Sequence, residues 1–108
     1  MGTDTLRMSA DVVSLPIAVV ATNASEVRAV LHDAVDFGTG PLVLDLGAVE
    51  RLDVVGLGVL MGAHRRAAGR GREMRVVQPS RRVAAVLHIT GLERVLCPRR
   101  PSAQEAPR

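Results

Sequence analysis

Few residues in this chain have the type and spacing that chemistry requires. The three histidines, His32, His64 and His88, fall in three separate apolar patterns, and no pair has the H-x-x-x-H spacing of a metal site. Cys97 has no histidine in a recognisable arrangement that would activate it as a nucleophile. The glycines of DVVGLGVLMG lack the lysine and hydroxyl residue of a phosphate-binding loop. We therefore expect no catalytic residues, no metal and no cofactor, and a protein that is not an enzyme.

The composition of this 108-residue chain, whose net charge is +3, excludes some classes of binding partner. Phe37 is its single aromatic residue, whereas binders that stack on single strands or RNA need several exposed rings. Eleven acids interrupt the arginines, so a stripe that tracks phosphates is not expected. No run approaches the roughly 18 apolar residues of a membrane span, and the N-terminus lacks a signal-peptide pattern. We expect a cytoplasmic protein with no nucleic acid partner and no membrane insertion.

Strand-type patterns that could position a site occur at four places. They are residues 11–21, 41–46, 74–77 and the short 95–96. Pro16 interrupts the first pattern, and because proline cannot donate to a ladder, it indicates an edge strand or a bulge. The second pattern, PLVLDL, is a short apolar run between turn residues, which is typical of a central strand buried on both faces.

Helical spacing of apolar residues fills the intervals between these strands. The three predicted helices lie between Asn23 and Gly38, from Gly56 to Ala68, and between Ser80 and Gly91. Asn23 and Glu26 have the form of a capping box at the first helix, and Ser80 can cap the third. The alternation predicts an α/β fold: a central, mostly parallel sheet of four or five strands with an N-terminal antiparallel or edge element, flanked by three or four helices.

Chain length predicts one domain, because compact domains cluster near roughly 100–150 residues. We expect a flexible N-terminus at residues 1–10 and the domain at residues 11–97. The last segment, PRRPSAQEAPR, has three prolines and almost nothing apolar. This composition predicts a disordered tail at residues 98–108.

The stretch RLDVVGLGVL, residues 51–60, lies where the middle helix begins. In α/β domains, partners tend to bind at the carboxyl ends of strands, where helix N-termini point free amides outward. Asp53 can cap this helix by accepting from amides two or three residues on, while Gly56 and Gly58 allow a close approach. These residues alone fit a capped helix without a further role as well as they fit a binding site.

The order of motifs in this chain resembles the STAS domain family, whose type members are bacterial anti-sigma factor antagonists. The resemblance covers roughly residues 12–96. It rests on LVLDL, the Asp53-x-x-Gly56-Leu57-Gly58 turn, the helix ending HRRAAGRG, MRVV with Gln78-Pro79 after it, and the close LHITGLERVL. It implies a regulatory protein of transcription that binds an anti-sigma factor of the serine-kinase type. The contact surface it implies comprises Asp53, Val54, Val55, Gly56, Leu57, Gly58 and Leu60.

One departure from the family concerns its regulatory switch. The family usually has Asp-Ser-Ser-Gly or Asp-Ser-Thr-Gly at this turn, and the partner kinase phosphorylates the second hydroxyl. This chain has Val54 and Val55, with Val55 at the phosphoacceptor position, and it contains no Ser, Thr or Tyr from residue 41 to 79. Val20 likewise stands where the family often has an acid. The resemblance therefore implies an antagonist that binds without the usual phosphorylation switch, or the decay of an abandoned regulatory site.

Several alternatives stay open at this point. The chain could be a STAS subunit of a larger assembly, either stressosome-like or associated with a transporter. It could also be a small-ligand sensor with an apolar pocket beside Val20 and Val55. A homodimer is compatible with the assembly subunit and with the ligand sensor. The arginines at the end of the middle helix are typical of a solvated helix terminus and could also pair with acids on a partner; they are Arg65, Arg66, Arg70 and Arg72.

Overall fold

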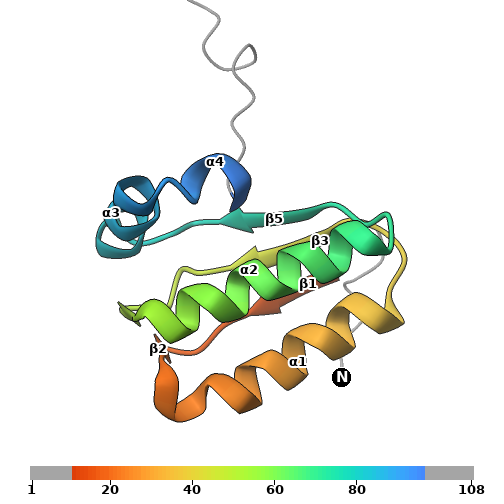
Figure 1. Cartoon of the computed structure of the whole chain (residues 1–108), viewed down its shortest axis with the longest axis horizontal. Helices are drawn as coiled ribbons and strands as arrows, with labels where there is room; N and C mark the ends of the chain where they lie inside the picture. Colours follow the sequence, from red (N-terminus) through yellow and green to blue (C-terminus); the bar gives the residue numbers. More distant parts are fainter. Residues whose placement is uncertain (1–10, 97–108) are drawn as a thin grey trace, which may run out of the picture.

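The strands form two parallel sheets in the computed structural model, which describes residues 11–96 (Figure 1). Three of the four predicted strand segments contribute to these sheets, and the short strand at Arg51–Leu52 was not predicted. The larger sheet has the order β1-β3-β5, with β1 at Asp11–Ser14, β3 at Leu42–Asp45 and β5 at Met74–Val77. The smaller sheet pairs β2, Ala18–Val19, with β4, Arg51–Leu52. The strands of this range are therefore divided between two sheets, where one sheet was predicted.

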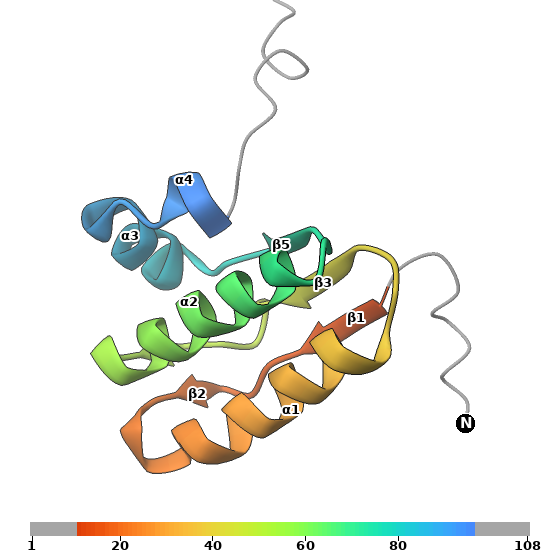
Figure 2. The same cartoon turned by 45° about the vertical axis from the view of Figure 1, so that its right-hand side comes forward.

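Helices alternate with the strands along the chain. A short 3-10 helix, η2, spans Ala21–Asn23 and leads into α1 at Ala24–Phe37, and the later helices are α2 at Val54–Gly69, α3 at Arg81–Thr90 and α4 at Glu93–Leu96. In both views α1 and α2 lie side by side across one face of the larger sheet, and α3 and α4 lie on the β5 side (Figures 1 and 2). The predicted fold class, a parallel sheet flanked by helices, is confirmed.

The middle strand, β3, carries much of the core. Leu42 and Leu44 are fully buried, whereas the alternate residues Val43 and Asp45 are only half-buried. Successive side chains of a strand point to opposite faces, so one face of the sheet packs beneath α1 and α2 and the other is less covered. The prediction that PLVLDL is buried on both faces is wrong, because within residues 11–96 the two long helices lie on the same face.

Pro16 lies between two strands, where one strand with an edge position or a bulge was predicted over residues 11–21. β1 ends before it and β2 begins after it, and β1 is an edge strand that runs parallel to β3. The short strand predicted at residues 95–96 is wrong, because these residues end α4, where the amide of Leu96 donates to the carbonyl oxygen of Leu92 at 2.8 Å. The flexible terminus predicted for residues 1–10 and the tail predicted for residues 98–108 lie outside the described residues.

Glycines and a serine set the helix boundaries where the sequence predicts them. The Ser80 hydroxyl accepts from the amide of Val83 at 3.1 Å and caps α3. Gly91 ends that helix in the left-handed region with φ of 80°, and Gly38 follows the last residue of α1. These three boundaries are confirmed.

Asn23 precedes α1, but its side chain does not cap that helix. Its Oδ1 accepts from the amide of Val20 at 2.9 Å, and its Nδ2 donates to the carbonyl oxygen of Ala18 at 2.8 Å. The predicted capping box with Glu26 is therefore wrong. Asn23 instead folds the chain between β2 and α1, because an amide side chain can both accept and donate.

Candidate binding site

Asp53 caps α2, as predicted, and it also holds a second segment of the chain. Its Oδ1 accepts from the amide of Gly56 at 2.8 Å, and its Oδ2 accepts from the amide of Ala21 in η2 at 3.0 Å. These two hydrogen bonds, with that from Gly56 the larger cause, hold the pKa of the Asp53 carboxyl below its usual range. The bond to Ala21 could not be found from the sequence, because it joins a carboxylate to a backbone amide 32 residues away.

The small sheet fixes the turn that leads into α2. Val19 pairs with Leu52, and the amide of Asp53 donates to the carbonyl oxygen of Val19 at 3.4 Å. The carbonyl oxygen of Ile17 accepts from the amides of Glu50 and Arg51 at 2.7 and 3.1 Å. The start of α2 is thus held by backbone contacts on one side and by the Asp53 side chain on the other.

The two glycines of the turn have different environments. Gly56 is buried against β2, and a Cβ atom at this position would overlap the carbonyl oxygen of Val19. A Cβ atom at Gly58 would meet no atom within 4 Å. The close approach predicted for Gly56 is therefore made by the chain's own strand, and Gly58 faces open space.

Val54 and Val55 lie at the surface in the first turn of α2. Val54 is 80% exposed and Val55 is 44% exposed. Leu57 is half-buried against the core, and Leu60 is fully buried. Leu60 was predicted to belong to the contact surface, but in this fold its side chain supports the surface from the core. The exposed part of the predicted set is Val54, Val55 and Gly58, and Asp53 is half-buried beside them.

A groove of about 350 Å³ adjoins this turn and extends to α3. Its lining residues are Val20, Glu50, Arg51, Leu52, Asp53, Arg82, Val83 and Val86. Val20 was predicted to lie beside the turn, whereas the contribution of α3 was not predicted. The signal for α3 was limited to the helical spacing of Val83 and Val86, which predicts an inward face but not which neighbour it meets.

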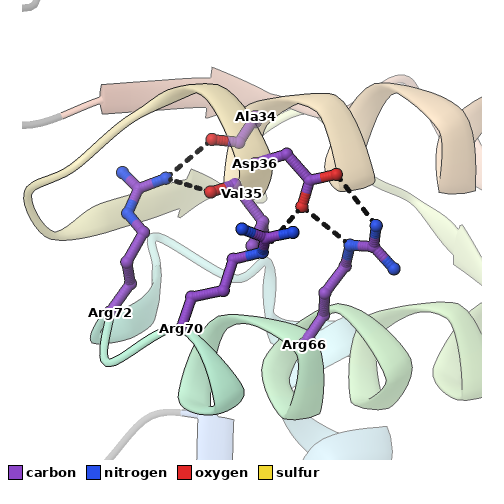
Figure 3. Close-up of polar contacts among 6 residues, drawn as sticks. All are labelled: Ala34, Val35, Asp36, Arg66, Arg70 and Arg72. Atoms are coloured by element: carbon purple, nitrogen blue, oxygen red, sulfur yellow. Dashed lines mark hydrogen bonds and ion pairs between the residues drawn. The ribbon is translucent and has the colours of Figure 1, made fainter.

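The arginines at the other end of α2 bind α1 (Figure 3). Arg66 makes a two-pronged contact with Asp36, and Arg70 lies 3.0 Å from the same carboxylate. The bond from Arg66 lowers the pKa of the Asp36 carboxyl, opposed by its partial desolvation. A solvated helix terminus or a partner site was predicted here. Arg66 and Arg70 are exposed, as a solvated terminus requires, but both also pair with Asp36 of the same chain.

Arg72 is buried, with 7% of its surface exposed. Its guanidinium donates to the carbonyl oxygens of Gly40, Ala34 and Val35 at 2.7 to 2.9 Å. Arg72 therefore satisfies carbonyl groups at the end of α1, which a helix leaves without partners. Arg65, the fourth arginine of the predicted cluster, is exposed.

The histidines of the described residues lie on three different helices. His88 contacts Glu93 through Nδ1 at 2.9 Å at the surface. Across residues 11–96, no group of three or more His, Cys, Asp or Glu side chains is placed to hold a metal ion.

In the same range, no helix has both the length and the apolar character that crossing a bilayer requires.

The described residues thus place a capped helix start and two exposed valines beside a groove, in a parallel α/β domain. The family model for the STAS domain matches residues 7–106. The chain belongs to the STAS domain family. The resemblance identified from the sequence motifs is therefore confirmed.

Two solved structures of STAS-like fold are similar to this STAS domain. One is a candidate anti-sigma factor antagonist from Thermotoga maritima, with 28% identity, a TM-score of 0.69, and coverage of 81% of this chain and 77% of that chain. The other is a sulfate transporter family protein from Wolinella succinogenes, with 16% identity, a TM-score of 0.65, and coverage of 86% and 75%. The second likeness shows the fold alone. No curated protein sequence is significantly similar to this chain.

Proposed function

We propose that this STAS domain is a non-enzymatic, anti-sigma factor antagonist-like protein that binds a bacterial anti-sigma factor of the serine-kinase type. Its docking surface is the start of α2, with Asp53, Val54 and Val55 in contact with the partner. The likeness to the Thermotoga maritima protein supports this choice of partner class. The role places the protein in the cytoplasm, where sigma factors act.

The observation that carries the proposal is the exposure of Val54 and Val55 at the first turn of α2. Burying a valine against a partner contributes about 1–2 kcal/mol. Both valines lie on a turn that the chain already holds in place through Asp53, so the partner need not order it. An aliphatic surface on a rigid turn suits a protein partner better than a polar small molecule.

The proposed antagonist has no phosphorylation switch at this surface. Residues 41–79 contain no hydroxyl side chain, and Val55 occupies the position that the family's kinases modify. Phosphate at a helix start would gain from the helix dipole, but it would also place about two negative charges in the interface. Without an acceptor, the complex persists in the presence of ATP.

Titration of the chain with a serine-kinase-type anti-sigma factor from its own genome, with and without ATP, tests the proposal. We expect binding in both conditions and no phosphate within residues 41–79 by mass spectrometry. Val55→Ser serves as the control for kinase activity, because it restores an acceptor at that position. Phosphate inside the window of the unaltered chain would contradict the proposal.

Val55→Glu tests the surface itself. We expect the affinity to fall by at least about tenfold, because a carboxylate would lose its hydration inside an apolar contact. Val30→Glu is the matched control, since Val30 is exposed to a similar extent, 52%, but lies on α1. Undiminished affinity of the Val55→Glu variant would remove the turn from the interface.

Two alternatives differ in the partner they require. A subunit of a stressosome-like or transporter-associated assembly needs only the fold, which the sulfate transporter family protein shares. A small-ligand sensor needs a closed apolar pocket, whereas the groove beside Val20 is open and Val55 does not line it. Failure of every serine-kinase-type anti-sigma factor of the genome to bind would favour the assembly subunit.

A further inference from the structure

The groove beside the α2 turn has an apolar floor that no other part of residues 11–96 fills. Val20, Leu52, Val83 and Val86 form this floor; Val83 is fully buried and the other three are half-buried. Leu52 comes from β4 and Val86 from the second turn of α3, so the groove joins the candidate surface to a helix far along the chain. A floor of this kind accepts an aliphatic side chain and offers no donor to a phosphate.

Arginines stand on the rim of this groove without partners of their own. Arg51 and Arg82 line the groove, and Arg81 lines an adjoining hollow together with Arg82, Glu50 and Ser80. All three arginines are exposed, and within the part of the chain that the structure describes, none of their guanidinium groups makes a hydrogen bond or an ion pair. The rim therefore holds three cations that are available to a partner.

Two acids also lie on the rim and do not neutralise it. Glu50 is exposed, and Asp53 uses both carboxylate oxygens to accept backbone amides. Both α2 and α3 begin at this groove, and each helix start carries the equivalent of about half a positive charge. Three arginines and two helix starts thus outweigh two carboxylates, and the local potential is positive.

The placement of Arg81 and Arg82 works against the stability of α3. They are the first two residues of that helix, whose first turn contains no acid. Cations are unfavourable at a helix start, where acids are usual. Since no contact among residues 11–96 compensates for them, a role in binding explains why they stand there.

We propose that this groove is the second half of the docking surface and receives an acidic segment of the protein partner. An aliphatic side chain of that segment packs on Leu52 and Val86, and carboxylates beside it pair with Arg51 and Arg82. The inference rests on the proposed function and deepens it, since it states the chemistry of the partner's contact segment. Arginine and carboxylate groups form two-pronged, charge-assisted hydrogen bonds that favour this pairing.

NMR titration of the full chain, labelled with ¹⁵N, tests the groove with a defined probe. The probe is a hexapeptide of two leucines flanked on each side by two glutamates and blocked at both ends. We expect amide shifts at residues 51–53 and 82–86 that weaken at high salt. The control is the same peptide with lysines in place of the glutamates. The proposal would be overturned if this control bound equally well, if the shifts occurred at other residues, or if the probe caused no shifts. Stronger shifts in the groove with a short oligonucleotide would also overturn it.

Charge reversal separates binding from folding. We expect Arg82→Glu and Arg51→Glu each to weaken binding of the acidic peptide by at least about fivefold. Arg28→Glu, on the exposed face of α1, makes the same change in net charge and should have no effect. Arg82→Glu should also leave the Tm equal or higher, because a carboxylate suits the start of α3. A fivefold loss shared by the Arg28→Glu variant would overturn the inference.

The two proposals fail in distinguishable ways against the anti-sigma factor. If Val55→Glu weakens binding and Arg82→Glu does not, the groove is not part of the interface and the proposed function stands. If the acidic peptide binds in the groove and no anti-sigma factor binds the chain, the proposed function fails and the chemistry of the groove stands. Loss of anti-sigma factor binding in both variants supports both.

Discussion

Asp53 shows how one residue of the turn has two structural roles. It caps α2 through Gly56, and it ties η2 to the same turn through Ala21. The first role follows from the residue type and its position before a helix. The second depends on the pairing of β2 with β4, which brings Ala21 beside the turn. A residue can thus be assigned a local role from sequence while its long-range partner stays hidden.

Acid should weaken the fold partly through Asp53. The pKa of the Asp53 carboxyl is lowered in the folded state. Its contribution to stability is therefore fully present above the ordinary carboxyl pKa of about 4, and it is lost as the pH falls through the lowered value. Asp53→Asn removes this contribution, because its amide nitrogen cannot accept from the second backbone N–H. We expect the variant to be less stable at pH 7 and its stability to vary less with pH below 5, measured by urea unfolding.

An unchanged dependence on pH in the Asp53→Asn variant would contradict this assignment. Asp36, whose pKa is also lowered, supplies a separate acid-sensitive contribution. The Asp36→Asn variant therefore shows how much of the remaining pH dependence comes from the contact between α1 and α2.

Gly56 and Gly58 form a matched pair for testing the geometry of the turn. Gly56→Ala should lower the free energy of unfolding by about 3 kcal/mol, because the new methyl group overlaps the carbonyl oxygen of Val19 and the backbone must move. Gly58→Ala should raise it by about 0.5–1 kcal/mol, since the position is helical and open. Chemical denaturation measures both, and equal effects of the two substitutions would contradict the packing described.

At the scale of elements, Arg72 joins the ends of two helices. It begins in the loop after α2 and donates to three carbonyl groups at and beyond the end of α1. Arg72→Ala should lower the free energy of unfolding by about 2–4 kcal/mol, because it leaves buried carbonyl oxygens without donors. Arg72→Lys should recover only part of this loss, since an ammonium lacks the planar fork.

Arg65→Ala is the control for Arg72, because Arg65 is exposed in the same region of the chain. We expect a change within about 0.5 kcal/mol. A loss comparable to that of the Arg72→Ala variant would mean that the general charge of this region, rather than the specific hydrogen bonds, stabilises the fold.

Sequence periodicity predicted most elements because each has a local signature. β5 was predicted with its observed bounds, and α2 and α3 within two residues at each end. The errors share a physical cause. Leu96 could belong to a strand or a helix by its residue type, and only packing against the core decides that it ends α4. Asn23 also suits a helix cap by its residue type, but its amide side chain instead bonds to the backbone of Val20 and of Ala18, at and just after β2.

The candidate site was predicted only in part for the same reason. Its turn is continuous in sequence, so Asp53, Val54 and Val55 were assigned together. The groove is not continuous, since Arg82 and Val86 come from a helix some 30 residues later. Which helix faces the turn depends on how α3 packs, and the amphipathic pattern does not state this.

At the scale of the whole molecule, the two ends of α2 have different roles. The proposed docking turn lies at its N-terminus, and the arginines that bind α1 lie at its end, so Val55 and Arg66 are about 16 Å apart along the helix axis. Effects of substitutions at such a distance are usually additive. Arg66→Ala should therefore lower the Tm without changing the affinity for the partner, and Val55→Glu should do the reverse.

The double variant with Arg66→Ala and Val55→Glu measures this independence. We expect its loss of stability and its loss of affinity to equal the sums of the single effects within about 0.5 kcal/mol. A larger coupling would mean that α2 transmits strain between its two ends and that the interface depends on the α1 contact.

The absence of a hydroxyl group on the exposed turn has a consequence for timing. A partner released by covalent modification departs when an enzyme acts, whereas the proposed complex on Val54 and Val55 would end only by spontaneous dissociation. Under the proposed function, the duration of the transcriptional response is then set by how fast cells make, dilute and degrade this protein. Its half-life in growing cells becomes the quantity that evolution can adjust.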